Sequence, residues 1–386
     1  MPKEHWRFIA LVHNLPLSVP VGNKYMALVP LSDARISQHM QDARFAHYAR
    51  SFSDQFGRKR KVSALIARGR IRRKPDSVLA FRNSLAMSSV VAAWERFLAY
   101  DSQLEHYKFS GYFDIYPFVP SKDFSLLVVN SPSVLGADEI EKFHGQTSPE
   151  LATAHASEGF FDPGIFASLM EAWVQRHAGR GPRNHQTEAV FRSLEMAYRA
   201  TRVPFDNRAS IGDYGAQLSL WVSAFEILAW PRNKRAGLDQ VLQMLRPVGS
   251  CSKRLQLRRY RVVRDKKVQN VSLPEKLYWE IYKARNAFLH GDPVTAQHLF
   301  PGARSDRHNL LAYAPVLYKC ALGTVLGFWS KSPTALEDIL TWRLRHSALV
   351  DAICSATKPS SGWRRRAWLR SRTKRRSGPP GDAATS

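Results

Sequence analysis

The sequence predicts a mixed α+β N-terminal region followed by an all-α helical bundle, so we expect the chain to be mainly α overall. Before residue 180, short runs rich in valine, leucine and aromatic residues stand beside one long helical pattern. After residue 185, apolar residues recur at helical spacing, and the breaks fall at prolines. The expected domains are therefore an N-terminal domain at 1–180, a bundle at 185–355 and a basic, disordered tail at 356–386.

Three strands are expected in the N-terminal domain, at 25–31, 112–119 and 124–130. Residues 120–123 read Pro-Ser-Lys-Asp, which is typical of a turn, so the second and third strands should form a hairpin. Helices are expected over 78–107 and 163–177. Nothing in these residues indicates what the N-terminal domain does.

Six helices are expected in the bundle, at 185–202, 209–230, 235–246, 273–290, 309–329 and 334–354. The fifth is apolar enough to suggest a membrane span. Lys319 lies at its middle, however, and Pro315 and Gly323 interrupt it, so a buried helix is expected and no integral membrane span.

Charge is the strongest compositional signal. The 386 residues are 44% hydrophobic, as in a globular protein, but carry a formal net charge of +25. Such an excess attracts polyanions through phosphate contacts and counterion release, so RNA and DNA lead the expected partners. An arginine-rich source composition is the alternative explanation for part of this excess.

The three cysteines, Cys251, Cys320 and Cys354, show neither a paired framework nor metal-ligand spacing. We therefore expect a reducing, cytoplasmic compartment and no metal site. The first twelve residues are too interrupted by charge to predict a signal peptide.

The fourth bundle helix carries the most informative residues. Ser272 and Glu275 have the spacing of a capping box, and Gly291 indicates the end of the helix. On a helical wheel, a core stripe is formed by Leu277, Ile281, Ala284 and Phe288, and a second apolar strip by Tyr278, Tyr282 and Leu289. His290 falls nearly opposite the core stripe, so it should face water or a partner, and the second strip predicts another neighbour.

Arg285 and His290 lie five positions apart at the end of this helix. Histidine suits proton transfer because its ordinary pKa is near neutrality, and the planar fork of arginine can hold two phosphate oxygens. These are the groups that metal-free RNA cleavage needs. A second such pair, Arg180 and His185, falls in a loop containing glycines and a proline, and we treat it as chance.

The segment Arg285-Asn286-Ala287-Phe288-Leu289-His290 resembles the signature of the HEPN domains, and within them the Apea-like HEPN group. In that signature an arginine and a polar residue are followed by three residues and a histidine near a helix end. The stretch Ala224-Phe225-Glu226-Ile227-Leu228 is similar to the family's Ala-x-Glu-x-Leu pattern on an earlier helix. The resemblance covers about residues 185–350. It implies a helical bundle that, in the ribonuclease members, brings two arginines and two histidines into one homodimer cleft.

Four residues are the candidate catalytic set. His290 would transfer protons and Arg285 would stabilise the phosphorane. Asn286 could hold the histidine or a phosphate, and Glu226 could orient Arg285 by a salt bridge or tune His290. No cofactor is expected, and no His-x-His, Asp-x-Asp or Glu-x-Lys set supports a metal-dependent enzyme.

A basic run leads into the fourth helix, in what the sequence predicts to be a loop. It is the segment placed to feed a phosphate backbone toward Arg285 and His290. Its candidate nucleic-acid-binding residues are Arg258, Arg259, Arg261, Arg264, Lys266 and Lys267.

The favoured hypothesis is a metal-independent endoribonuclease acting as a homodimer, in the role of a stress or phage-defence effector with an antitoxin or other regulatory protein as partner. The alternative is a non-catalytic HEPN module that binds RNA, a nucleotide or a protein through the same helix. In that case Arg285 is a helix-end arginine paired with Glu226, and His290 is a histidine favoured by the helix dipole.

Overall fold

The structure is a computed structural model. It describes residues 5–68, 75–100, 107–130, 135–147, 156, 159–179, 184–202, 210–230, 236–248, 259–264, 266–292, 295–299 and 309–327. The expected helix at 334–354 and the expected tail at 356–386 lie outside these residues. Helices outweigh strands in the part that is described, so the prediction of a mainly α chain is confirmed.

The main sheet has four antiparallel strands in the order β1-β4-β3-β2. These strands are β1 (Trp6–Val12), β2 (Val21–Gly22), β3 (Met26–Pro30) and β4 (Ser63–Arg68). Alternate residues of β4 are buried on opposite faces, with Ile66 facing one core cluster and Leu65 the other. The short helix α2 (Ala43–Arg50) covers one face through Phe45, and Met40 of the short helix α1 (Ser37–Met40) packs against the same cluster.

A second sheet has the order β5-β6-β7. Its strands are β5 (Val119–Pro120), β6 (Leu126–Asn130) and β7 (Leu135–Glu139). The expected hairpin between β5 and β6 is confirmed, with Val119 opposite Val128. The strand expected over 112–119 is wrong for most of its length. Ser110–Phe113 forms the 3-10 helix η1 instead, and the Ser110 hydroxyl donates to the carbonyl of Tyr198 (2.8 Å).

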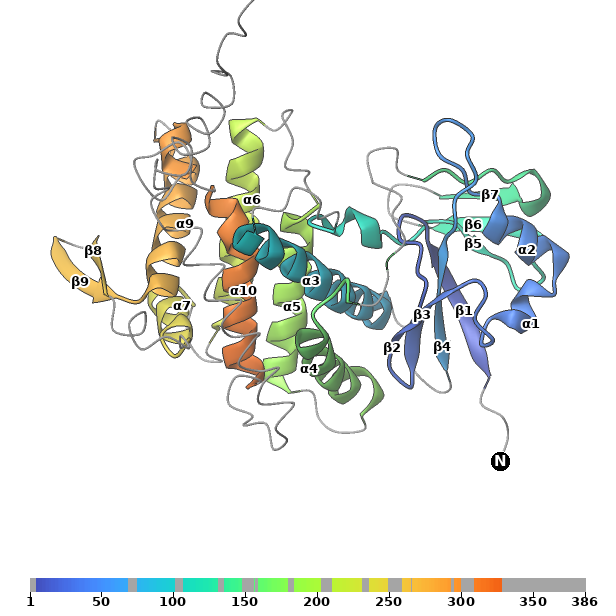
Figure 1. Ribbon diagram of the computed structural model, residues 1–386, viewed down its shortest axis with the longest axis horizontal. Helices are drawn as coiled ribbons and strands as arrows, with labels where there is room; N and C mark the ends of the chain where they lie inside the picture. Colours follow the sequence, from blue (N-terminus) through green and yellow to red (C-terminus); the bar gives the residue numbers. More distant parts are fainter. Residues whose placement is uncertain are drawn as a thin grey trace, which may run out of the picture.

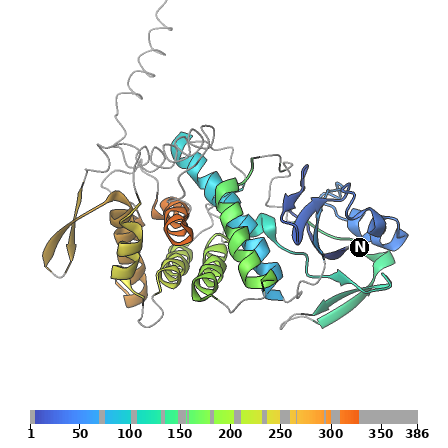
Figure 2. The same ribbon diagram turned by 90° about the horizontal axis from the view of Figure 1, so that it is seen from below.

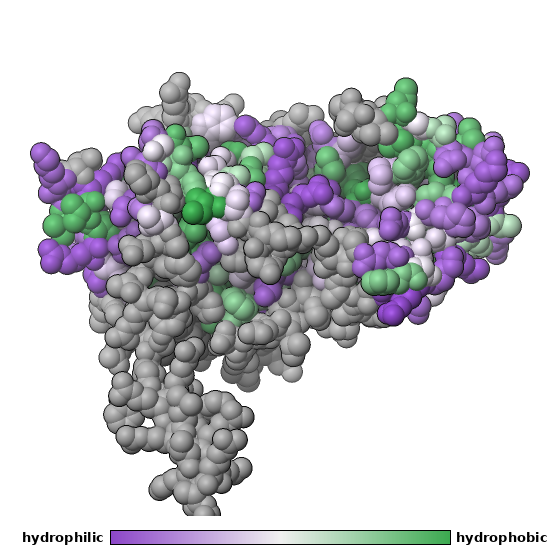
Figure 3. All heavy atoms as spheres, turned by 90° about the horizontal axis from the view of Figure 1, so that it is seen from above, coloured by the Kyte–Doolittle hydropathy of each residue, from purple (hydrophilic) through white to green (hydrophobic). Residues whose placement is uncertain are grey.

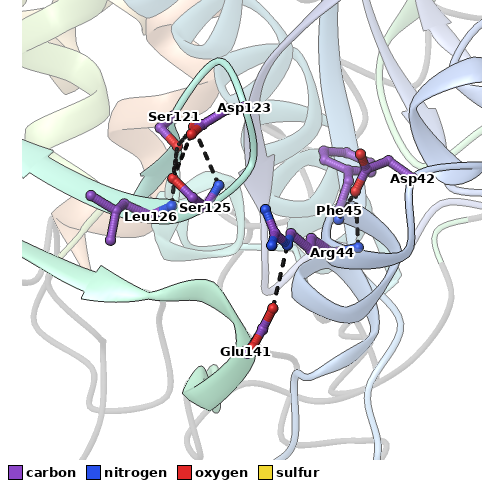
Figure 4. A network of polar contacts seen from close by, with 8 residues as sticks. All are labelled: Asp42, Arg44, Phe45, Ser121, Asp123, Ser125, Leu126 and Glu141. Atoms are coloured by element: carbon purple, nitrogen blue, oxygen red, sulfur yellow. Dashed lines mark hydrogen bonds and ion pairs between the residues drawn. The ribbon is translucent and has the colours of Figure 1, made fainter.

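Polar side chains fix the turn of this hairpin and the start of α2 (Figure 4). The Asp123 carboxylate accepts a hydrogen bond from the Ser125 hydroxyl (2.8 Å). The Asp42 carboxylate caps α2 by accepting from two backbone amides of its first turn. An ion pair of 3.3 Å joins Arg44 of α2 to Glu141 of the 3-10 helix η2 (Ile140–Lys142). The second sheet is thereby tied to the helices that cover the first.

The remaining elements are helical except for one hairpin. They are α3 (Pro75–Tyr100), α4 (Pro163–Trp173), the π-helix η3 (Val174–Ala178), α5 (His185–Ala200), α6 (Ile211–Leu228), α7 (Leu238–Leu245), α9 (Leu273–His290), the 3-10 helix η4 (Ala296–Leu299) and α10 (Leu310–Leu326). In Figure 1, α5, α6, α9 and α10 run close to parallel with one another, and α3 crosses them toward the main sheet. Figure 2 looks nearly along these helices and shows α10 lying over α5 and α6.

One hydrophobic core joins helices from both sides of residue 180. Phe81 of α3 and Trp173 of α4 belong to the same buried cluster as Trp221 of α6 and Leu317 of α10. The helix expected over 309–329 is found as the buried α10. None of the described helices combines the length and the apolar content needed to cross a bilayer.

The expected loop before the fourth bundle helix is wrong, because this segment is a β-hairpin. Strands β8 (Tyr260–Arg264) and β9 (Lys267–Val271) pair antiparallel, and Lys266 between them has a φ of 62°. The hairpin projects from the end of the molecule opposite the main sheet (Figure 1). Val263 and Val268 pair on its outer face and are 64% and 53% exposed. Figure 3 shows this apolar patch at its left end, flanked by hydrophilic residues.

Candidate functional site

Helix α9 spans Leu273–His290, as the sequence predicts. The Glu275 carboxylate accepts from the backbone amide of Ser272 (2.8 Å), and the Ser272 hydroxyl accepts from the amide of Glu275. At the other end, Gly291 adopts a left-handed φ of 75°, which lets the chain turn away without a Cβ clash. Both ends of α9 are thus fixed by local signals, and so is the position of the Arg285 and His290 pair at its last turns.

The faces of α9 agree with the helical wheel in most respects. Leu277, Ile281 and Ala284 are buried. Tyr278 of the second apolar strip is also fully buried, whereas Leu289, at the end of that strip, is 58% exposed. The second strip therefore begins in the core and ends in solvent.

Helices α6 and α9 pack antiparallel and very closely. Gly215, near the start of α6, faces Phe288, near the end of α9, and a Cβ on Gly215 would lie 2.5 Å from the Phe288 ring. Toward the other end of the pair, the rings of Phe225 and Tyr278 lie 5.0 Å apart. Glu226 follows Phe225 directly, so its backbone is level with Tyr278 rather than with Arg285.

Arg285 reaches Glu226 by leaning toward the start of α9, which is the usual lean of a helical side chain. Its Nη2 lies 3.8 Å from Glu226 Oε2, and its Nη1 donates to Asn286 Oδ1 at 2.8 Å. The guanidinium carbon lies 5.5 Å from the centre of the Tyr282 ring, within reach of a cation–π contact. The expected salt bridge to Glu226 is therefore present as a long ion pair, and Asn286 holds the arginine.

Burial and charge act on Glu226 in opposite directions. Burial raises the pKa of the Glu226 carboxyl, and the positive charge of Arg285 partly offsets this rise. Burial also raises the pKa of Tyr278 well above its ordinary value, with the charge of Glu226 acting in the same direction. The Tyr278 hydroxyl therefore keeps its proton, and a hydrogen bond to an acceptor would stabilise it.

His290 is separate from this cluster. It is exposed at the last position of α9, and no hydrogen bond or ion pair joins it to other residues within the described part of the chain. The expectation that it faces water or a partner is confirmed. The structure thus brings Arg285, Asn286 and Glu226 together within one chain, and leaves His290 apart from them.

The candidate nucleic-acid-binding residues lie on or beside the β8–β9 hairpin, except Arg258, which falls outside the described residues. Arg259, Arg261, Lys266 and Lys267 are exposed. Arg264 is instead paired with Asp239 of α7, its Nη2 lying 3.0 Å from Asp239 Oδ2. The hairpin joins the start of α9, roughly 20 Å along the helix from Arg285.

Two further sets of residues lie away from the pair. A cavity of about 350 Å³ opens between α3 and α5, and its lining includes Asn83, Phe191 and Met196 but neither Arg285 nor His290. Within the described ranges, no group of three His, Cys, Asp or Glu side chains is arranged to hold a metal ion. Of the second Arg-x4-His pair, Arg180 lies outside the described residues and His185 is the first residue of α5.

The sequence indicated Tyr278 and Tyr282 only as apolar residues. Their polar role follows from spacing, because residues 278, 282 and 285 recur at intervals of four and three and therefore share one face of α9 with the arginine. That signal alone could not show that Glu226 would lie against the same face. No family model matches the chain, and comparison with curated proteins and with solved structures also finds no match.

Proposed function

We propose that this protein is a metal-independent endoribonuclease of the HEPN type, in which Arg285 and His290 act on RNA at a cleft between two copies of the chain. The observation that supports this most is the pairing of a restrained arginine with an exposed histidine at one helix end. Arg285 is held by Glu226 and Asn286, while the His290 side chain is exposed at the surface.

The proposed reaction needs two proton transfers and one stabilised charge. His290 removes the proton from the ribose 2′-hydroxyl, whose oxygen attacks the adjacent phosphorus. Arg285 stabilises the negative charge of the phosphorane through two guanidinium nitrogens. The leaving 5′-oxygen takes a proton from the second copy's His290, so the products are a 2′,3′-cyclic phosphate and a 5′-hydroxyl.

A second copy supplies the acid in this proposal, because one histidine cannot easily serve both the attacking and the leaving oxygen. Leu289 is 58% exposed next to His290, and an exposed leucine at a helix end favours a contact with another chain. Pairing through this end of α9 would bring two exposed histidines toward one another.

The β8–β9 hairpin is the proposed RNA arm. Arg261 and Lys267 are exposed on it, and it leads directly into α9. An RNA strand that contacts both the hairpin and Arg285 would run along α9 for several nucleotides. Its phosphates would meet positive charge over that length, which gives binding that weakens with salt.

Cleavage in the presence of EDTA tests the proposal. Wild type and His290→Ala are incubated with mixed structured and single-stranded RNA, and their masses are measured by light scattering. We expect the wild type to cut, and His290→Ala to lose about a hundredfold or more of the rate with fold and mass retained. His144→Ala is the matched control, because His144 is also an exposed histidine but lies next to η2, in the N-terminal region.

The second candidate is a non-catalytic module that binds RNA, a nucleotide or a protein. It is favoured by the direction of Arg285, which leans away from His290 and toward Glu226. Under this hypothesis the wild type binds RNA without cutting it, or the wild type and His290→Ala cut RNA at the same rate. Either result removes the catalytic role of His290.

A further inference from the structure

Two hydrogen-bond donors are buried without acceptors beside the candidate site. Within the residues that the structure describes, neither the Tyr278 hydroxyl nor the Nε of Arg285 has a hydrogen-bond partner, and neither atom reaches solvent. A buried donor without an acceptor costs free energy, so native structures rarely keep one without a reason. Here two such donors lie on one face of α9.

Glu226 provides a carboxylate beside these donors, and that carboxylate can accept further hydrogen bonds. A carboxylate has two oxygens that together accept about four hydrogen bonds. The Glu226 carboxylate stands 3.8 Å from Arg285 Nη2, which is too long for a good hydrogen bond. Because Phe225 packs on the Tyr278 ring at 5.0 Å, the next residue of α6, Glu226, is brought level with Tyr278. The two donors and the Glu226 carboxylate are therefore neighbours, but among the described residues no hydrogen bond joins them.

We propose that Tyr278 is a positioning residue, whose hydroxyl donates to the Glu226 carboxylate when Arg285 turns from that carboxylate toward an RNA phosphate. The inference rests on the proposed function, since it takes the ligand of Arg285 to be an RNA phosphate. In the described arrangement Glu226 and Asn286 hold the arginine back. When a phosphate draws the guanidinium away, Glu226 loses its cation, and the Tyr278 O–H replaces part of that interaction.

This arrangement gives Tyr278→Phe an unusual pair of effects. The variant removes only the hydroxyl, and in the unliganded protein that hydroxyl has no acceptor among the described residues. The melting temperature should therefore stay the same or rise. RNA binding should weaken about three- to tenfold, the size expected for one hydrogen bond made only in the complex.

Tyr48→Phe provides the matched control. Tyr48 is also a fully buried tyrosine, but it lies in the N-terminal region, and its hydroxyl donates to the carbonyl of Phe118 at 2.7 Å. Removing that hydroxyl should lower the melting temperature and leave RNA affinity unchanged. The two phenylalanine variants should thus show opposite patterns.

Binding is measured by fluorescence anisotropy with a 2′-O-methyl RNA oligonucleotide, which cannot be cleaved because its 2′-oxygen is blocked. Glu226→Ala, which removes the acceptor, and the double variant Tyr278→Phe/Glu226→Ala complete a double-mutant cycle. We expect the loss caused by Tyr278→Phe to vanish in the Glu226→Ala background. The inference is overturned if Tyr278→Phe binds like wild type, if its loss is the same in both backgrounds, if it melts earlier than wild type, or if wild type fails to bind.

Cleavage of the matching 2′-hydroxyl RNA separates this inference from the proposed function. If wild type binds the blocked RNA in the Tyr278-dependent way but cuts nothing, the ribonuclease proposal fails and the positioning role stands. If wild type cuts and Tyr278→Phe cuts and binds equally well, the ribonuclease proposal stands and the positioning role fails.

Discussion

Arg285 and Glu226 lie on different helices. Local sequence signals predict where Arg285 lies on α9, but they do not predict its contact with Glu226. The capping box at Ser272 and the C-cap at Gly291 fix the two ends of α9 and hence the position of Arg285 along the helix. The contact with Glu226 depends on how closely α6 approaches α9, which is set by Gly215 against Phe288. The residue pair could be named from sequence, but its 3.8 Å separation and the direction of Arg285 could not.

Arg285→Lys tests whether the shape of the cation matters. Lysine keeps the charge but replaces the planar fork with a point charge, so it cannot hold two phosphate oxygens in the same way. We expect the cleavage rate to fall about ten- to hundredfold while the melting temperature changes little. Arg50→Lys, an exposed arginine at the end of α2, serves as the control in the same RNA assay. Equal rates for Arg285→Lys and wild type would argue that any cation is sufficient.

The elements divide into those that local patterns predict and those that they do not. Helices α5, α6 and α9 follow apolar periodicity and capping residues, so their expected ranges agree closely with the observed ones. Strands β1 and β4 were missed, since Val12 meets Ser63 only through the fold of the intervening chain. The β8–β9 hairpin was missed because its strands are rich in Arg and Lys, and because Lys266 rather than glycine takes the positive φ.

Helix α10 contains a buried cation that sequence showed only as an interruption of an apolar run. Lys319 Nζ lies 2.7 Å from Glu95 of α3 and 2.8 Å from Asp162, which caps α4. Lys319→Met should lower the free energy of unfolding by about 3–5 kcal/mol, because it leaves two carboxylates buried without their cation. Lys142→Met, which breaks an exposed pair with Glu139, should leave the free energy of unfolding almost unchanged. Urea denaturation at neutral pH measures both.

The same cluster predicts a pH dependence. Burial alone would lower the pKa of Lys319, but the charges of Glu95 and Asp162 outweigh it and raise that pKa above its ordinary value of 10.5. A raised lysine pKa contributes stability that is complete below 10.5 and is lost as the pH rises through the folded-state value. The gap in unfolding free energy between wild type and Lys319→Met should therefore shrink as the pH is raised above 10.5. A constant gap would contradict this.

At the scale of the whole molecule, the exposed end of α9 is the expected contact between two copies. Leu289→Asp places a charge where an apolar contact is proposed, so light scattering should show the mass of one chain. Cleavage per chain should fall with it, because each cleft would lose one histidine. Leu135→Asp is the control, since Leu135 on β7 is 81% exposed and lies in the N-terminal region. A monomeric wild type with full activity would rule out the shared cleft.

Because α3, α4 and the bundle share one core, the bundle is not an independent structural unit. Phe81 and Trp173 come from before residue 180, yet they are buried in the same cluster as Trp221 and Leu317. A recombination event that moved only the bundle to another gene would leave behind part of its interior, including Glu95 and Asp162, the two carboxylates that neutralise Lys319. A bundle moved without α3 and α4 would therefore keep Lys319 buried without its two carboxylates and would have to rebuild that part of its core.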